Sequence, residues 1–289
     1  ERDALEKRFI NLLKDAQGTV DARGFICRML ERVGTEASVT ALAPLLVDPE
    51  LSAPAQRALG DMPYASVDTA LQDALTSTLP PTLREGLIGT LAQRGGAAAV
   101  PAVLPFTENP EPQLRLAAVR ALGILGGPLA EKRLQALLQA EPTNIEVARA
   151  LVSCAAASLR QGDADHAAVL CRQMLDQGKA GAVRAGALQI LSEAKGDLAI
   201  PAVISALQGT QEEPMDVALN CVRDLPGSAM LAALKEAVPA LRPEVQGLVL
   251  YALAARGDHA AAPVAAALLG SPTETVRTAA AAALGYIGS

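Results

Sequence analysis

Side chains that could carry catalytic or metal chemistry are few and scattered in this chain of 289 residues. The two histidines, His166 and His259, are each followed by two alanines and lie in distant parts of the sequence. Helices pack about 8–10 Å apart, so the helices between them keep these imidazoles from sharing a metal ion. Each histidine follows an aspartate, Asp165 or Asp258, and we interpret both pairs as helix starts capped by the aspartate. Because no Ser-His-Asp arrangement, glycine-rich phosphate loop or paired-carboxylate pattern is found either, the sequence predicts no catalytic residue, metal or cofactor.

The four cysteines are spaced as buried structural residues. Cys27, Cys154, Cys171 and Cys221 show no Cys-x-x-Cys spacing. We expect small thiol side chains packed within helices. Cys154 and Cys171 lie on consecutive predicted helices, so a disulfide between these two stays open, and with it the redox compartment.

Composition favours an all-α chain and opposes binding to nucleic acid. Hydrophobic residues make up 51% of the sequence and aromatics only 2%, so alanine and leucine, which suit packed helices, carry the apolar content. The formal net charge is −6, whereas nucleic acid is bound mainly through Lys and Arg at its phosphates. No apolar run reaches the roughly 18–20 residues that cross a bilayer, so we predict no membrane insertion. We expect a monomer.

An internal repeat organises the chain. The repeat contains an arginine, then Leu seven residues later and a closing residue, usually Gly, eleven residues later. We call this spacing the frame, its arginine the frame arginine, and count positions (−1, +3, +7) from that arginine. Apolar residues at −1, +3 and +7, as in Leu114, Ala118 and Leu122 around Arg115, predict a helix with one buried stripe that ends at the glycine. Five segments carry the frame: Arg23–Leu30–Gly34, Arg84–Leu91–Gly95, Arg115–Leu122–Gly126, Arg184–Leu191–Lys195 and Arg277–Leu284–Gly288. Two more keep it with changed residues: Gln246–Leu253–Gly257 and Asp216–Arg223–Gly227.

A second predicted helix precedes each of these segments. Proline-containing turns, such as Asn109-Pro110 and Ser271-Pro272, separate the two helices. One hairpin of about 31 residues cannot enclose its own core, so successive hairpins must stack. The sequence therefore predicts one all-α domain over 1–289, a right-handed α-α superhelix (α-solenoid) of about nine hairpins. The predicted units are 1–34, 35–60, 61–96, 97–127, 128–162, 163–196, 197–227, 228–257 and 258–289.

The repeated segments resemble the HEAT-like repeat family, in the short variety named for phycobilisome lyases. The resemblance is good over 82–127 and 181–289 and looser elsewhere, and 21–39 also resembles HEAT regions of large bacterial multidomain proteins. It implies the α-solenoid fold but little about activity, because the family includes scaffolds, bilin lyase subunits, an iron hydroxylase and DNA glycosylases. The hydroxylase branch needs His-Glu pairs, which His166 and His259 do not form. The sequence begins with Glu1, so we expect an excised piece of unknown localisation; a soluble extracytoplasmic part of a larger bacterial protein is one reading.

The frame arginines recur too regularly to be specific ligand contacts. We predict that they form a structural ladder with acidic turn residues such as Asp48, Glu108 or Glu274. The ladder comprises Arg23, Arg84, Arg115, Arg184 and Arg277.

Positions +5 and +9 vary in chemistry, as exposed positions should, and we name them the exposed row. Solenoids bind partners along the face formed by one helix of each unit, so we predict that this row lines a groove. Tyr251 and Tyr286 are the candidate anchors, because interface energy concentrates in Tyr, Trp and Arg. The predicted partner-binding residues are Arg28, Arg32, Gln93, Arg120, Gln189, Glu193, Tyr251 and Tyr286. The resulting hypothesis is a non-catalytic scaffold that binds a protein, for instance another domain of its parent chain; the alternative is a chromophore lyase-like or cofactor-enzyme accessory subunit.

Overall fold

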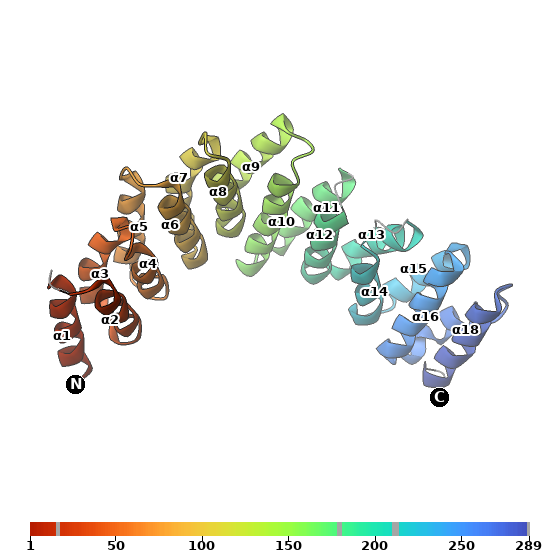
Figure 1. The fold of residues 1–289 in the computed structure, drawn as a ribbon. Helices are drawn as coiled ribbons and strands as arrows, with labels where there is room; N and C mark the ends of the chain where they lie inside the picture. Colours follow the sequence, from red (N-terminus) through yellow and green to blue (C-terminus); the bar gives the residue numbers. More distant parts are fainter. Residues whose placement is uncertain (16–17, 178–180, 210–213, 288–289) are drawn as a thin grey trace. The chain divides into compact units, whose positions relative to one another are not determined.

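The computed structural model describes residues 1–15, 18–177, 181–209 and 214–287, and throughout these ranges every regular element is helical (Figure 1). The chain divides into two compact units, Glu1–Cys154 and Ala155–Ser289. The prediction of an all-α fold is confirmed. The organisation of 1–289 as a single domain of nine units stays a prediction.

The first unit holds α1 to α9 and most of α10, which crosses the division. The α-helices are α1 (Arg2–Lys14), α2 (Val20–Val33), α3 (Glu36–Leu42), α4 (Ser52–Gly60), α5 (Ala65–Thr76), α6 (Pro81–Arg94), α7 (Val100–Val103), α8 (Pro112–Leu125), α9 (Pro128–Ala140) and α10 (Ile145–Arg160). Three short 3₁₀ helices, η1 (Ala43–Val47), η2 (Ala97–Ala99) and η3 (Leu104–Glu108), extend or precede the first helices of hairpins.

The second unit repeats the alternation. Its helices are α11 (Ala164–Asp176), α12 (Gly181–Ala194), α13 (Gly196–Gln208), α14 (Met215–Asp224), α15 (Ala229–Ala237), η4 (Val238–Ala240), α16 (Pro243–Arg256), η5 (His259–Ala261), α17 (Ala262–Ala266) and α18 (Glu274–Ile287). Prolines shorten several first helices: Pro44, Pro105 and Pro239 each lie in the first turn of a 3₁₀ segment, because proline cannot donate the α-helical hydrogen bond.

The even-numbered helices, which include all those that carry the frame, pack side by side within each unit. In the first unit α2 packs on α4, α4 on α6 and α6 on α8; in the second, α12 packs on α14, α14 on α16 and α16 on α18. The predicted core positions around Arg115 are confirmed, since Leu114, Ala118 and Leu122 are at most 1% exposed. Ala22, at the −1 position of the first frame, is exposed instead. The closing Gly288 lies outside the described residues.

The frame arginines bind backbone carbonyls of the turn between the two helices of a hairpin, so the expectation of carboxylate partners is wrong for those described below. Arg115 Nη1 donates to the carbonyls of Asn109 (2.7 Å) and Pro110 (2.8 Å). Arg277 Nη1 donates to Ser271 (2.9 Å) and Pro272 (3.1 Å) in the same way. The carbonyls after a helix end lack intrahelical partners, and a guanidinium satisfies two of them at once.

The frame residues of α6 and α16 do the same, although the second is a glutamine. Arg84 Nη2 donates to Ser77 O (3.1 Å), and Gln246 Nε2 donates to Val238 O (3.0 Å). The expected acidic partners have other uses: Glu108 pairs with Arg133 (2.8 Å), and the Asp48 carboxylate accepts the amide hydrogens of Glu50 and Leu51.

Two predicted local details need correction. The cap of α11 is Asp163, whose Oδ1 accepts the His166 amide (3.0 Å), and not Asp165. Asp258 does cap η5, as predicted, by accepting the Ala260 amide (2.9 Å). In α14 the buried stripe includes Val222 while Arg223 is exposed, so the frame lies one residue earlier than the Asp216–Arg223 spacing suggests.

A buried carboxylate ties the first two hairpins together. Glu6 in α1 is only 4% exposed and accepts hydrogen bonds from the Thr35 amide (2.6 Å) and the Ser38 hydroxyl (2.6 Å) at the start of α3. Burial alone would raise the pKa of Glu6, but these hydrogen bonds outweigh it and leave the pKa below its ordinary value of 4.5.

Candidate functional site

All eight predicted partner-binding residues have side chains exposed to solvent. They lie on α2, α6, α8, α12, α16 and α18 and are Arg28, Arg32, Gln93, Arg120, Gln189, Glu193, Tyr251 and Tyr286. Positions +5 and +9 of one helix are four residues apart and therefore lie one turn apart on the same side. Because the buried stripe occupies −1, +3 and +7, this side faces away from the core. The structure thus places these side chains on the accessible side of their helices, while their role in binding stays a proposal.

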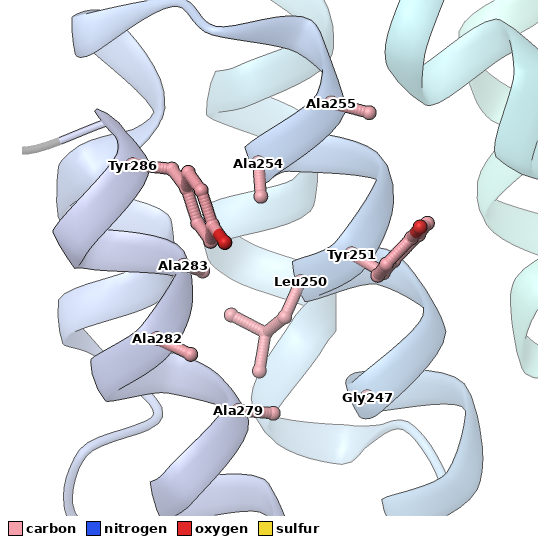
Figure 2. Close-up of a pocket in the computed structure, with 9 residues that line it drawn as sticks. All are labelled: Gly247, Leu250, Tyr251, Ala254, Ala255, Ala279, Ala282, Ala283 and Tyr286. Atoms are coloured by element: carbon pink, nitrogen blue, oxygen red, sulfur yellow. The ribbon is translucent and has the colours of Figure 1, made fainter.

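An apolar groove lies between α16 and α18, and we call it the tyrosine groove (Figure 2). Its volume is about 330 Å³. Its lining residues are Gly247, Leu250, Tyr251, Ala254, Ala255, Ala279, Ala282, Ala283 and Tyr286. Four residues of the predicted row, Tyr251, Ala255, Ala282 and Tyr286, therefore meet at one site.

Small residues open this groove. Gly247, Ala279 and Ala282 stand where larger side chains would fill the space between the helices, and Leu250 (1% exposed) and Ala283 (3% exposed) close its base. Tyr251 and Tyr286 are 79% and 76% exposed. Figure 2 shows Tyr286 reaching from α18 toward α16, and Tyr251 projecting from α16 on the side away from α18. The site therefore offers an apolar base with two accessible aromatic rings.

The groove carries none of the side chains used for acid–base or nucleophilic chemistry at neutral pH. Apart from the two tyrosine hydroxyls, its lining is Gly, Ala and Leu. The cysteines lie elsewhere, all four buried with free thiols, so the suggested Cys154–Cys171 disulfide is absent. Burial raises the pKa of the Cys27 thiol to about 11 and those of Cys154 and Cys171 to about 12, which keeps these thiols protonated.

Three of the predicted partner-binding residues in the first unit are arginines, Arg28, Arg32 and Arg120, and none is aromatic. Arg120 in α8 pairs with Glu146 (2.9 Å), which also binds Arg149 (3.0 Å). Arg28 in α2 lies over the half-exposed ring of Phe25, 5.7 Å from its centroid. These arrangements leave guanidinium groups accessible on this face.

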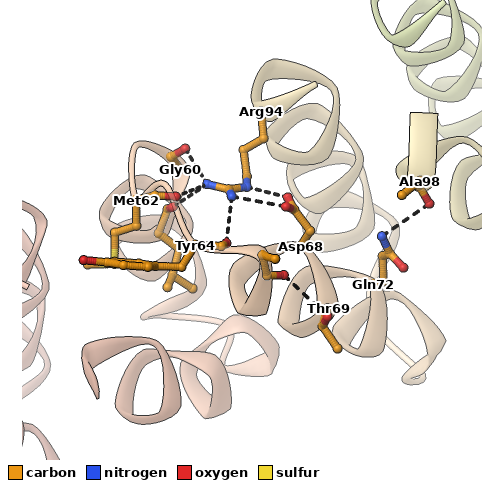
Figure 3. A network of polar contacts seen from close by, with 10 residues as sticks. Gly60, Met62, Tyr64, Asp68, Thr69, Gln72, Arg94 and Ala98 are labelled. Carbon is orange, nitrogen blue, oxygen red and sulfur yellow. Dashed lines mark hydrogen bonds and ion pairs between the residues drawn. The ribbon is translucent and has the colours of Figure 1, made fainter. Parts of the chain in front are cut away.

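Sequence reasoning missed a largely buried arginine that ties α6 to the preceding hairpin (Figure 3). Arg94, at the end of α6, is 9% exposed, and its Nε lies 2.6 Å from Asp68 Oδ1. Its Nη1 donates to Gly60 O (3.0 Å) and Met62 O (2.6 Å), and its Nη2 to Tyr64 O (3.1 Å). One side chain therefore joins the end of α6 to the end of α4 and the start of α5.

The second unit has an equivalent clamp. Arg256, at the end of α16, donates to the carbonyl of Val222 in the last turn of α14 and to those of Leu225 and Gly227 just after it, and its Nε lies 3.3 Å from Asp258. Both arginines directly precede the closing glycine of their segment, in Arg94-Gly95 and Arg256-Gly257. That dipeptide is the signal by which the clamp could have been found.

Neither a metal cluster nor a membrane-spanning helix is found in the part of the chain that the structure describes. No three His, Cys, Asp or Glu side chains gather there in a way that could hold a metal ion. No helix there is both long and apolar enough to cross a membrane. His166 lies in α11, whereas His259 lies in η5 with its Nδ1 2.6 Å from Ile287 O.

Comparison with known proteins agrees with this architecture. Residues 69–153 match the family model described as HEAT repeats. No curated protein matches the sequence. Among solved structures, Kap95p with RanGDP superposes with a TM-score of 0.55 at 13% identity, over 96% of this chain and 46% of that chain. Kap121p bound to the extreme C-terminus of the protein phosphatase Cdc14p gives 0.53 at 14% identity, over 99% and 37%.

The chain spans less than half the length of these karyopherins, and the likeness at such identity concerns the fold alone. The CpcE–CpcF complex of phycocyanin lyase from Nostoc sp. PCC7120 is also similar, with a TM-score of 0.43 and 18% identity over 86% of this chain and 94% of that chain. That score is too low to support the lyase alternative. The paired helices and the likeness to the two karyopherins identify the fold as an α-solenoid, and within it residues 69–153 match HEAT repeats.

Proposed function

We propose that this chain is a non-catalytic scaffold that binds a protein partner, with apolar side chains of that partner seated in the tyrosine groove. The observation that carries the proposal is the pair of tyrosines, 79% and 76% exposed, beside a groove whose base is Leu250 and Ala283. An aromatic ring left in water gains by burial against a partner, and tyrosine does so with few rotatable bonds.

The size and lining of the groove suit a side chain better than a reaction. A volume of about 330 Å³ holds one or two apolar side chains of a bound segment. Alanine and glycine on its walls let the partner backbone approach both helices closely. The tyrosine hydroxyls at the rim can hydrogen-bond that backbone while their rings cover apolar atoms.

A selected peptide library tests the proposal. Random peptides are panned against the immobilised full chain, and the dissociation constants of those enriched are measured by fluorescence anisotropy. Loss of a buried anchor costs about 2 kcal/mol or more, so Tyr251→Ala and Tyr286→Ala should each weaken binding about 30-fold. Leu248→Ala is the matched control, because Leu248 is an exposed side chain of α16 that does not line the groove.

The outcome against the proposal is equally definite. If no peptide binds saturably, or if the enriched peptides bind both tyrosine variants as well as the Leu248→Ala chain, the groove is not a protein-binding site. Absorbance titration with a linear tetrapyrrole distinguishes the scaffold from the chromophore-lyase alternative. The alternative requires that the tetrapyrrole spectrum changes on addition of the chain and that Tyr286→Ala abolishes this change.

A further inference from the structure

An arginine line crosses the exposed face of the first unit. At the +5 position of four successive second helices, α2, α4, α6 and α8, lie Arg28, Arg57, Gly89 and Arg120, all exposed. Three of the four are arginine, and we use the name arginine line for Arg28, Arg57 and Arg120. The packing of α2 on α4, α4 on α6 and α6 on α8 puts these positions in order along one face.

Arg57 joins the line only through the structure, because α4 has no frame arginine. Ser52 takes the frame position, since its hydroxyl donates to Leu46 O (2.7 Å) in the turn of its hairpin. The buried residues of α4, Ala55 and Leu59, then occupy +3 and +7, as Ala118 and Leu122 do in α8. Counting from Ser52 puts Arg57 at +5.

The arginines of this face outnumber the carboxylates that form ion pairs with them. Arg28 and Arg57 make no ion pair with any residue that the structure describes; Arg28 has only its contact with the Phe25 ring. Arg120 and Arg149 share the single carboxylate of Glu146. In a chain with a net charge of −6, accessible unpaired arginines gathered on one face indicate a ligand that supplies negative charge.

We propose that this face binds an extended, acidic protein segment whose carboxylates are separated by about three residues or a multiple of three. This proposal rests on the proposed function of the chain as a protein-binding scaffold. Neighbouring helices lie about 8–10 Å apart, and an extended chain advances about 3.3 Å per residue, so about three residues span one helix. A segment with carboxylates at its first, fourth and tenth residues would meet Arg28, Arg57 and Arg120 in turn. Gly89 provides the gap between them, where an added Cβ would touch nothing within 4 Å.

Discrete carboxylates fit this face better than a nucleic-acid backbone does. Guanidinium groups bind carboxylate and phosphate alike through paired hydrogen bonds. Asp61, directly after α4, and Glu85 in α6 are also exposed, however, and Glu146 pairs with both Arg120 and Arg149. A continuous run of phosphates would be repelled by these groups, whereas a segment with separated carboxylates can place neutral residues opposite them.

The probe is a fluorescein-labelled synthetic peptide of about ten residues, with glutamate at its first, fourth and tenth positions and Ser or Gly elsewhere. Its comparison peptide has the same composition with the three glutamates adjacent. Binding to the full chain is followed by anisotropy at low and at physiological salt. We expect the spaced peptide to bind about tenfold more tightly than the clustered one, with an affinity that falls as salt rises.

Variants of the chain test the register of the peptide. Arg57→Ala should weaken binding of the spaced peptide about threefold to fivefold, as for one accessible ion pair. Gly89→Arg should tighten binding of a peptide that also carries glutamate at its seventh position by a similar factor. Lys132→Ala, which removes an exposed cation from α9 off this face, is the control for net charge.

Equal binding of spaced and clustered peptides, or an effect of Arg57→Ala no larger than that of Lys132→Ala, would overturn the proposal. Tighter binding of a single-stranded oligonucleotide than of either peptide would overturn it in favour of a nucleic-acid surface. The outcomes of this test and of the tyrosine-groove test can be told apart. If the spaced peptide does not bind but the groove peptides do, only the proposal of an acidic segment is refuted. If the groove peptides do not bind, the proposed function itself is refuted.

Discussion

Gly123 lies where α8 closely approaches α10, and replacing it by alanine tests that approach. A Cβ built at Gly123 would lie 2.7 Å from the carbonyl oxygen and 2.8 Å from the Cα of Ala150 in α10. Both are backbone atoms, so the clash cannot be relieved by turning a side chain. A Cβ built at Gly89, in the middle of α6, would touch nothing within 4 Å. The two glycines therefore form a matched pair.

The expected effects have opposite signs. Alanine in place of glycine inside a helix stabilises by about 1 kcal/mol, and Gly89→Ala should gain roughly that amount. Gly123→Ala gains the same local term, but the overpacking costs about 3 kcal/mol, at the upper end of the usual range, because backbone must move. We expect Gly123→Ala to lower the free energy of unfolding by about 2 kcal/mol, a difference of about 3 kcal/mol between the two variants.

Urea unfolding of the full chain, followed by far-ultraviolet circular dichroism, measures both effects. The midpoint and the slope are compared with those of the unsubstituted chain, since an unchanged slope assigns the shift to stability. If Gly123→Ala raised the midpoint as Gly89→Ala does, the close approach of α8 and α10 at Gly123 would be refuted.

Two further predictions concern buried polar groups. Arg94→Met should lower the free energy of unfolding by about 3 kcal/mol, because it leaves the turn carbonyls and Asp68 without their donor. Urea unfolding midpoints measure this change. A loss below about 1 kcal/mol would show that the clamp is dispensable. The second is a pH effect. Because the folded-state pKa of Glu6 is lowered, its contribution is complete above the ordinary value of 4.5 and is lost as the pH falls through the lower folded value. The stability difference between the unsubstituted chain and Glu6→Gln should therefore shrink on acidification below that value, and a difference that stays constant across urea titrations at several pH values would contradict this.

Much of the fold and the exposure of the row could be predicted because helix periodicity is local. The frame around Arg115 places Leu114, Ala118 and Leu122 in the core and Arg120 on the surface through spacing alone. The same counting placed Tyr251 and Tyr286 on exposed positions. That they border one groove depends on the small residues of α16 and α18 between them, which only the packing of these two helices reveals.

Hydrogen-bond partners and frame shifts could not be predicted, because they depend on residues far apart in the sequence. Arg115 was expected to meet a carboxylate but binds turn carbonyls, since the end of the preceding helix brings those within reach. Arg57 entered the arginine line only once Ser52 was seen in the frame position.

The sequence by itself determined the helices, the glycine that ends several second helices and the side of those helices that faces solvent, because these follow from the order of residues within about four positions of one another. Only the tertiary structure decided what lies between helices: the tyrosine groove, the clamp of Arg94 and the arginine line. Those features arise where side chains from different hairpins meet, and a distance across hairpins is set by packing rather than by spacing along the chain.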